Sequence, residues 1–290
     1  WYNERMKYPK IDLKTIRLQA RQFQAENPRL FLVYLLPSML VILSGFLNPL
    51  ERINESVLEE PFFSVFGHIS QVYLFPLLVS FIGTILLTSS VYTTLKLIKN
   101  PDTELSVKNS LTLFNEEHFS QTFLTLLLKR FYLFLWSIPS LLGIYFLFYS
   151  SFLAKKFVAI HPEFPNLDLT SIETERFLMT FGLYFLASIL LMIVGNSLYI
   201  PQYYAYSQVE FLLCDTLDLG QAKPGQILKT SRFLMKGYKF QRFVLDLQLL
   251  PWYFLNWITF GIASFSLLPY IQINKMIFYR AVLARKRPKA

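Results

Sequence analysis

Six long apolar stretches, separated by segments that carry most of the charge, constrain the fold of this chain more than any other feature. They cover residues 30–47, 72–95, 131–152, 177–200, 243–258 and 260–282. A helix needs about 20 apolar residues to cross the hydrocarbon of a bilayer, and its internal hydrogen bonds satisfy the backbone there. The pattern therefore predicts an all-α, polytopic membrane helix bundle with about six transmembrane helices, which forms one integral membrane domain over residues 1–290.

The composition agrees with this class and excludes an ordinary soluble protein. The chain is 53% hydrophobic and only 16% charged, whereas soluble domains are about 25% charged. The net charge of +9 is typical of a membrane protein whose basic residues gather on the cytoplasmic side. We expect no nucleic-acid partner, since the sequence contains no recognition module.

The distribution of basic residues predicts the orientation. With both termini in the cytoplasm, the outer loops 48–71 and 153–176 hold four of the 28 Lys and Arg residues, and the inner segments hold the other 24. This asymmetry follows the positive-inside rule. We therefore expect a multi-pass protein of the bacterial plasma membrane, with four spans in 30–200, a cytoplasmic segment at 201–242, and a transmembrane hairpin with a basic tail at 243–290.

Two cytoplasmic segments are predicted to form amphipathic helices on the membrane surface. The first lies in 1–29 and ends at Asn27 before Pro28, because the residue before a proline is pushed out of helical geometry. The second begins at Pro224 and ends at Gly237. Basic stripes on such helices bind anionic headgroups, and we expect these contacts from Lys10, Lys14, Arg17, Arg21, Lys229, Arg232 and Lys236. A docking face for a cytoplasmic partner is the alternative.

Asp246 stands out because it lies about one turn inside the apolar stretch 243–258. A carboxylate within a membrane segment is costly and often functional. The interpretation that we favour is a structural salt bridge with Arg242 or Lys239. Proton or cation handling is the alternative.

Each apolar stretch also carries or adjoins a proline: Pro37, Pro76, Pro139, Pro201, Pro251 and Pro269. A proline inside a helix frees a carbonyl that needs another donor in lipid. These prolines fit ordinary membrane-helix composition or kinks that open a cavity.

No set of residues predicts catalysis, and we expect no enzyme activity, metal or cofactor. Asp215 and Asp218 could form a two-carboxylate site, but we expect them to cap the helix that begins at Pro224. His68, His118 and His161 are predicted to lie on different sides of the membrane, so one chain could not use them for one metal site. Phosphate loops, nucleophile elbows and metalloprotease helices are missing from the sequence.

The last quarter of the chain resembles an uncharacterised family of multi-pass membrane proteins of Gram-positive bacteria, domain-of-unknown-function family 975. The matching motifs are Met235-Lys236-Gly237, Phe243 with Asp246-Leu247, Trp252, Thr259 with Gly261-Ile262, Pro269-Tyr270 and Phe278-Tyr279. Pro251 and Asn256 stand where the family has small residues. The resemblance implies a bacterial plasma-membrane location and no particular activity.

The function predicted from these features is a non-enzymatic accessory or scaffold subunit of a membrane complex in envelope maintenance or export. Its expected partners are the bilayer and either another membrane protein or a second copy of the chain. The alternative is a small transporter or lipid-handling protein that uses proline-kinked helices around Asp246.

Overall fold

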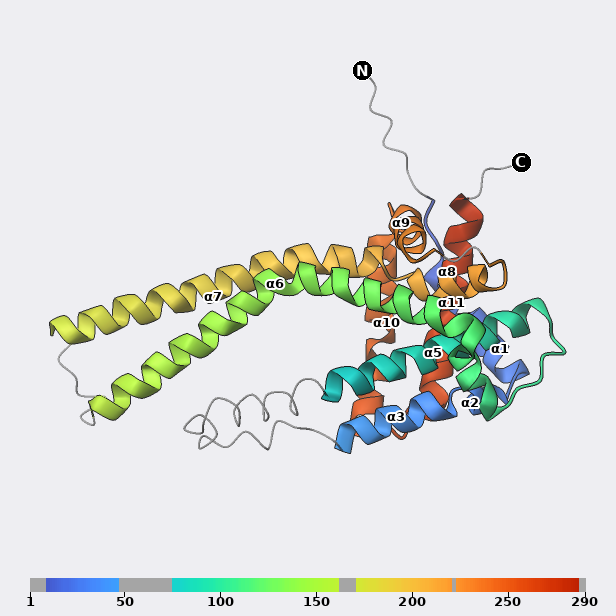
Figure 1. The fold of residues 1–290 in the computed structure, drawn as a ribbon, viewed down its shortest axis with the longest axis horizontal. Helices are drawn as coiled ribbons and strands as arrows, with labels where there is room; N and C mark the ends of the chain where they lie inside the picture. The colour runs from blue at the N-terminus through green and yellow to red at the C-terminus, as the bar shows by residue number, and fades with distance from the viewer. Residues whose placement is uncertain (1–8, 47–74, 162–170, 221–222, 287–290) are drawn as a thin grey trace, which may run out of the picture. The chain divides into compact units, whose positions relative to one another are not determined.

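The computed structural model describes residues 9–46, 75–161, 171–220 and 223–286, which are helical and form no strand (Figure 1). This confirms the all-α class for these ranges. The elements are α1 (Leu13–Glu26), α2 (Leu30–Val33), α3 (Leu35–Phe46), α5 (Phe75–Lys99), the 3-10 helix η4 (Val107–Phe114), α6 (Glu116–Ile160), α7 (Ile172–Ala205), α8 (Val209–Leu217), α9 (Pro224–Leu234), α10 (Lys239–Ile258) and α11 (Ser264–Lys286). Contacts divide the chain into two units: Trp1–Leu128 with Ala205–Ala290, and Lys129–Tyr204.

Three helical segments in the described ranges are long and apolar enough to cross a membrane, namely Pro76–Lys99, Glu116–Ile160 and Ile172–Leu217. They include most of the predicted spans 72–95, 131–152 and 177–200, and they indicate a membrane protein. Leu35–Ser44, in the first predicted span, is a shorter apolar helix. The last two predicted spans form α10 and α11, of 20 and 23 residues, but neither helix is among the three.

The break between α2 and α3 shows how a proline is accommodated in the first unit. Pro37 has no N–H with which to bond the carbonyl of Val33, four residues earlier. That carbonyl instead accepts hydrogen bonds from Ser90 Oγ at 2.7 Å and Ser110 Oγ at 2.6 Å. Hydroxyls from α5 and η4 therefore satisfy the oxygen that the proline leaves free.

The same face of α5 is lined with buried hydroxyls. Ser89 Oγ donates to the carbonyl of Asn109 at 3.0 Å and accepts from the backbone N–H of Leu113 at 3.1 Å. The hydroxyls of Tyr34 and Thr94 lie 3.0 Å apart. These bonds hold η4 and α2 against α5, so the hydroxyl-rich side of this apolar helix faces protein.

α1 packs antiparallel against α11, with Ile16 and Ala20 buried in the contact face. At one end Arg285 Nη2 donates to the carbonyl of Lys10 at 3.2 Å, and at the other Gln24 Nε2 donates to the carbonyl of Ser266 at 3.0 Å. The helix ends at Glu26 with Asn27 as its C-cap. The predicted end of this helix before Pro28 is confirmed.

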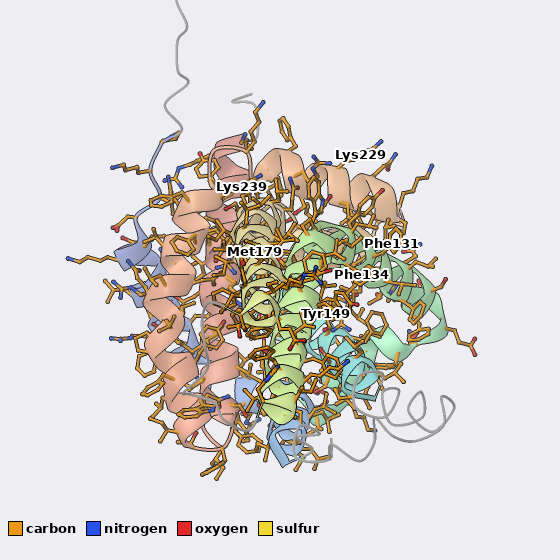
Figure 2. The ribbon with its side chains drawn as sticks, turned by 90° about the vertical axis from the view of Figure 1, so that its left-hand side faces the viewer. Phe131, Phe134, Tyr149, Met179, Lys229 and Lys239 are labelled. Atoms are coloured by element: carbon orange, nitrogen blue, oxygen red, sulfur yellow. The ribbon has the colours of Figure 1, made fainter. Side chains whose placement is uncertain are left out.

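The α10–α11 hairpin runs across the direction of α3 and α5 in both views of the first unit (Figures 1 and 2). The hairpin turns at Phe260, with φ 50°, and Gly261, with φ +86°, between the two apolar stretches 243–258 and 260–282. A Cβ on Gly261 would lie 3.1 Å from Ile42 Cγ1, and Ser264 Oγ donates to the carbonyl of Ser38 at 3.4 Å. The turn of the hairpin and the start of α11 therefore rest against the middle of α3.

The second unit is an antiparallel pair formed by α7 and the part of α6 after Lys129. Their closest approach is at Gly195, where a Cβ would lie 2.5 Å from the backbone nitrogen of Ser140. Near the far end of the pair, the rings of Phe157 and Phe177 stack with their centroids 3.9 Å apart. Small residues at helix contacts are typical of membrane helices, because they let the backbones approach.

Candidate functional site

The densest set of paired charges in the described part of the first unit surrounds α8. Six of its nine residues are buried: Val209, Phe211, Leu212, Leu213, Cys214 and Leu217. This apolar packing fixes the helix between its neighbours. It therefore also fixes the direction of two carboxylates, Asp215 in the last turn and Asp218 at the C-cap.

Asp215 joins α8 to two other helices. Its Oδ1 lies 3.1 Å from Nζ of Lys99 at the end of α5, and its Oδ2 accepts a 2.7 Å hydrogen bond from the hydroxyl of Tyr279 on α11. The ring of Tyr279 stacks on Phe211 with centroids 5.5 Å apart. Hydrogen bonds to a charged acceptor are stronger than neutral ones, so one carboxylate holds three helices together.

Asp218 repeats this arrangement one helical turn later. The hydroxyl of Tyr92 donates to its Oδ1 at 2.5 Å, and Lys96 Nζ lies 4.0 Å from the same oxygen. Lys96 Nζ also lies 4.5 Å from the centroid of the Tyr92 ring, within the range of a cation–π contact. The His118 ring is 6.1 Å from the Tyr92 ring.

The predicted capping role of Asp215 and Asp218 is wrong. The N-cap of α9 is Lys223, and no side chain caps that helix. The partners of these carboxylates, which were not predicted, are Tyr92, Lys96, Lys99 and Tyr279. A clue was present, since two lysines three residues apart end one apolar stretch and two aspartates are also three residues apart, so each pair lies on one helix face.

Asp246 forms an ion pair within α10. Its Oδ1 lies 2.9 Å from Nη1 of Arg242, one turn earlier. The Arg242 side chain is only 4% exposed and that of Asp246 is 21% exposed. The guanidinium of Arg242 also lies 5.9 Å from the ring centroid of Phe278 on α11. The pair therefore anchors a buried arginine between the two helices of the hairpin.

Lys239, the second predicted partner, is half-buried at the start of α10. Burial, together with the charge of Arg232, lowers the pKa of its ammonium group. The observed pair of Asp246 is with Arg242, and Lys239 lies three residues before that arginine.

Most basic residues of α1 and α9 lie on the surface, while Arg17 is half-buried. Lys14, Arg17 and Arg21 line, with the exposed Leu18, a hollow of about 300 Å³. Lys10, just before α1, is exposed. Lys229, Arg232 and Lys236 are exposed on and just after α9, and Figure 2 labels Lys229 on the outer side of that helix. α9 begins at Pro224, as predicted, and ends at Leu234, three residues before Gly237. Contact of these residues with lipid headgroups stays a prediction.

The arrangement around α8 suits the joining of neighbouring helices better than acid–base chemistry. Both carboxylates are engaged by a lysine and a tyrosine, and the thiol of Cys214 is buried and donates to the carbonyl of Thr88 at 3.6 Å. Over the ranges that the structure describes, no three His, Cys, Asp or Glu residues gather closely enough to hold a metal ion. We infer that this cluster fixes α5, α8 and α11 relative to one another.

Comparison with known proteins assigns the family. The model of the family described as "Protein of unknown function (DUF975)" matches residues 6–286, and the chain belongs to this family. No curated protein and no solved structure matches the chain. The match over residues 6–286 covers nearly the whole chain.

Proposed function

We propose that this DUF975 protein is a non-enzymatic accessory or scaffold subunit of a membrane complex that serves envelope maintenance or export. It is a multi-pass protein of the bacterial plasma membrane with both termini in the cytoplasm. The rule that basic loops stay inside supports this orientation. The anionic headgroups of the inner leaflet are the expected partners of Lys229, Arg232 and Lys236.

The observation that carries the proposal is the exposed apolar surface of the second unit. In the most apolar stretch of α6 and of α7 only 6% of residues are buried inside the chain, against 50% in the corresponding stretch of α5. On α7 the side chains of Leu183, Leu186, Leu190 and Ile193 are each more than 60% exposed. Figure 2 labels three further residues of this pair that are more than half exposed, Phe131, Phe134 and Met179.

This surface suits association inside the membrane. Helices in lipid associate through packing and hydrogen bonds rather than through the hydrophobic effect, so the exposed outward faces of this pair gain packing from a protein neighbour. The ionic cluster of the first unit supports the same role, because its carboxylates are used in joining helices. A rigid first unit and an exposed helical pair together fit a subunit that holds other membrane proteins, or a second copy of itself.

Extraction in a mild detergent, followed by measurement of the mass of the protein complex, tests the proposal. We expect a species larger than the 34.1 kDa chain, after subtraction of bound detergent, and a defined protein in it. A monomer without any co-purifying protein would contradict the accessory role. Repeating the extraction in a harsher detergent serves as the control, because it should release the 34.1 kDa chain.

A transporter or lipid-handling protein is the second candidate, and one observation favours it. In the part of the chain that the structure describes, the Nε of Arg242 and the Oε1 of Gln248 are buried and have no hydrogen-bond partner, and both residues are close in sequence to Asp246. Buried polar atoms of this kind are usually satisfied by water, and water near a carboxylate is what a proton path requires. Replacement of Asp246 by Asn separates the two candidates, since only the transporter needs an ionisable group there.

A further inference from the structure

α10 presents a continuous apolar stripe on its outer side. Its members are Phe240, Leu247, Leu250, Phe254 and Trp257, which are 54–75% exposed. Successive members are seven, three, four and three residues apart, which places them on one face along the whole helix. Arg242, Leu245 and Leu249 on the opposite face are buried. An exposed apolar surface of this length needs a cover.

The packing of α1 argues against a transmembrane α11. α1 lies antiparallel along α11 from the bond between Lys10 and Arg285 to the bond between Gln24 and Ser266. Because two helices packed in this way have nearly parallel axes, their axes make the same angle with the membrane. Lys14 and Arg21 are exposed along α1, and Asp12 and Glu26 are exposed at its two ends. If α11 crossed the bilayer, it would carry these charges into the hydrocarbon, where they are strongly disfavoured.

The direction of the hairpin leads to the same conclusion. α5 is long and apolar enough to cross the membrane, and α10 and α11 run across it (Figure 1). The turn of the hairpin contacts α3 at Ser38 and Ile42. A helix that runs across a spanning helix lies along the membrane rather than through it.

We propose that α10 lies along the cytoplasmic surface of the membrane with its apolar stripe in the inner leaflet, and that the α10–α11 hairpin does not cross. The spans are then the four stretches 30–47, 72–95, 131–152 and 177–200. Both termini remain in the cytoplasm, because this count is also even. This inference requires that α5 crosses the membrane and does not require the accessory role. Either proposal can therefore be wrong while the other holds.

The charge pattern is compatible with this change. Residues 243–274 contain no Lys or Arg, so the distribution of basic residues between the two sides is the same with four or six spans. The ion pair of Arg242 and Asp246 lies near the headgroups instead of in hydrocarbon, where it would be costly. α11 lies between α10 and α1 in Figure 1. Lys14 and Arg21 on α1 therefore face the cytoplasm, which replaces the predicted contact of α1 with lipid.

Depth measurements along the stripe test the inference. Cys214 is the only cysteine, so Cys214→Ala provides a background for single cysteines at Phe240, Leu247, Leu250, Phe254 and Trp257. The full chain is spin-labelled and reconstituted into vesicles of phosphatidylethanolamine and phosphatidylglycerol. Relaxation by oxygen and by a water-soluble nickel complex then gives the depth of each label. Labels at Gln19 and Gln22 on α1 are the matched controls and should be accessible to the nickel complex.

We expect the five labels to be accessible to oxygen and to share one depth to within about 5 Å, the scale of one helical turn. A spanning α10 would instead separate Phe240 and Leu250 by about 15 Å in depth, which would overturn the inference. Accessibility to nickel along the stripe, or protection from both reagents, would also overturn it, since water or protein would then cover the stripe.

Labelling in intact cells gives an independent answer. Ile262 at the turn of the hairpin is 65% exposed, and Glu173 lies in the first turn of α7, which is predicted to be outside. A membrane-impermeant maleimide should label Glu173→Cys but not Ile262→Cys in intact cells. Labelling of both variants would place the turn outside and restore the six-span topology.

Discussion

The hydroxyl of Tyr279 donates a 2.7 Å hydrogen bond to the carboxylate of Asp215, and this contact joins α11 to α8 across 64 residues of sequence. The other oxygen of the same carboxylate lies 3.1 Å from Nζ of Lys99 on α5. Tyr279 is almost fully buried, so water cannot easily replace this acceptor. The contact is one of the points at which the C-terminal hairpin is fixed to the rest of its unit.

Loss of the Tyr279 hydroxyl should destabilise the first unit. Tyr279→Phe removes a hydrogen bond to a charged acceptor, and we expect the free energy of unfolding to fall by about 1.5–3 kcal/mol. Thermal unfolding of the protein in mild detergent, followed by circular dichroism, measures the change. Tyr145→Phe is the control, because Tyr145 is 60% exposed on α6. Equal melting temperatures for the two variants would contradict the role of this contact.

Asp246 should matter for stability through Arg242. Asp246→Ala leaves a guanidinium that is 4% exposed without its partner, which costs about 3 kcal/mol, the lower end of the range for a broken buried pair because Asp246 is partly exposed. Asp246→Asn keeps an acceptor oxygen and should cost less. Lys239→Gln, three residues before Arg242, is the control and should have a small effect.

The same variants distinguish scaffold from transporter. If the protein is an accessory subunit, the Asp246→Asn variant should form a complex of unchanged mass in mild detergent. Cells that carry this variant should then behave as wild-type cells do in an envelope-stress assay. A proton-coupled transporter would lose its activity while keeping its fold. Loss of cellular function by a stable, correctly assembled Asp246→Asn protein would therefore count against the accessory role.

The effects of Ser90, Ser110 and Pro37 on stability should depend on one another, because all three residues act on the carbonyl of Val33. Ser90→Ala and Ser110→Ala each remove one hydrogen bond and should cost about 0.5–1.5 kcal/mol. The double variant should cost more than the sum, because the buried carbonyl is then left without a donor. Pro37→Ala restores an N–H four residues after Val33, so Ser90→Ala should cost less in that background. Additive losses in both comparisons would show that the serines act independently of this carbonyl.

In the helix pair of the second unit, a larger side chain should be destabilising at Gly195 and tolerated at Gly182. Gly195→Val would force a side chain into Ser140, since a Cβ there lies 2.5 Å from the backbone nitrogen and 2.9 Å from Cα. Overpacking of this kind costs about 1–3 kcal/mol. Gly182→Ala is the matched control, because nothing lies within 4 Å of the position that its Cβ would take; it should stabilise the helix by up to about 1 kcal/mol. Thermal unfolding distinguishes the two variants, and equal shifts would contradict the close contact.

The parts of the fold that depend on local sequence could be predicted. Pro28 ends the first helix, Pro224 begins another, and Gly261 makes the turn of the hairpin because it adopts a positive φ. Each of these features follows from the conformation that one residue permits. Apolar length also identified three segments that could cross a membrane.

The parts that depend on distant residues could not be predicted. Asp215 and Asp218 read as helix caps, and only the fold brings Lys99 and Tyr92 within reach of them. Apolar length also cannot distinguish a helix that crosses a bilayer from one that packs along its surface. The hairpin contains no basic residue between 243 and 274. The positive-inside rule, which predicted the orientation of the chain, therefore cannot decide whether α10 and α11 cross the membrane.

Photo-crosslinking inside cells tests the accessory role most directly. A photoreactive phenylalanine at Leu190, which is 63% exposed on α7, should give a discrete protein adduct, because we expect this face to contact a membrane protein or a second copy of the chain. The same residue at Leu247, on the proposed lipid-facing stripe of α10, should give none. Adducts from Leu190 alone, identified by mass spectrometry, are the predicted result. The absence of any protein adduct from Leu183, Leu186, Leu190 and Ile193 would contradict the account.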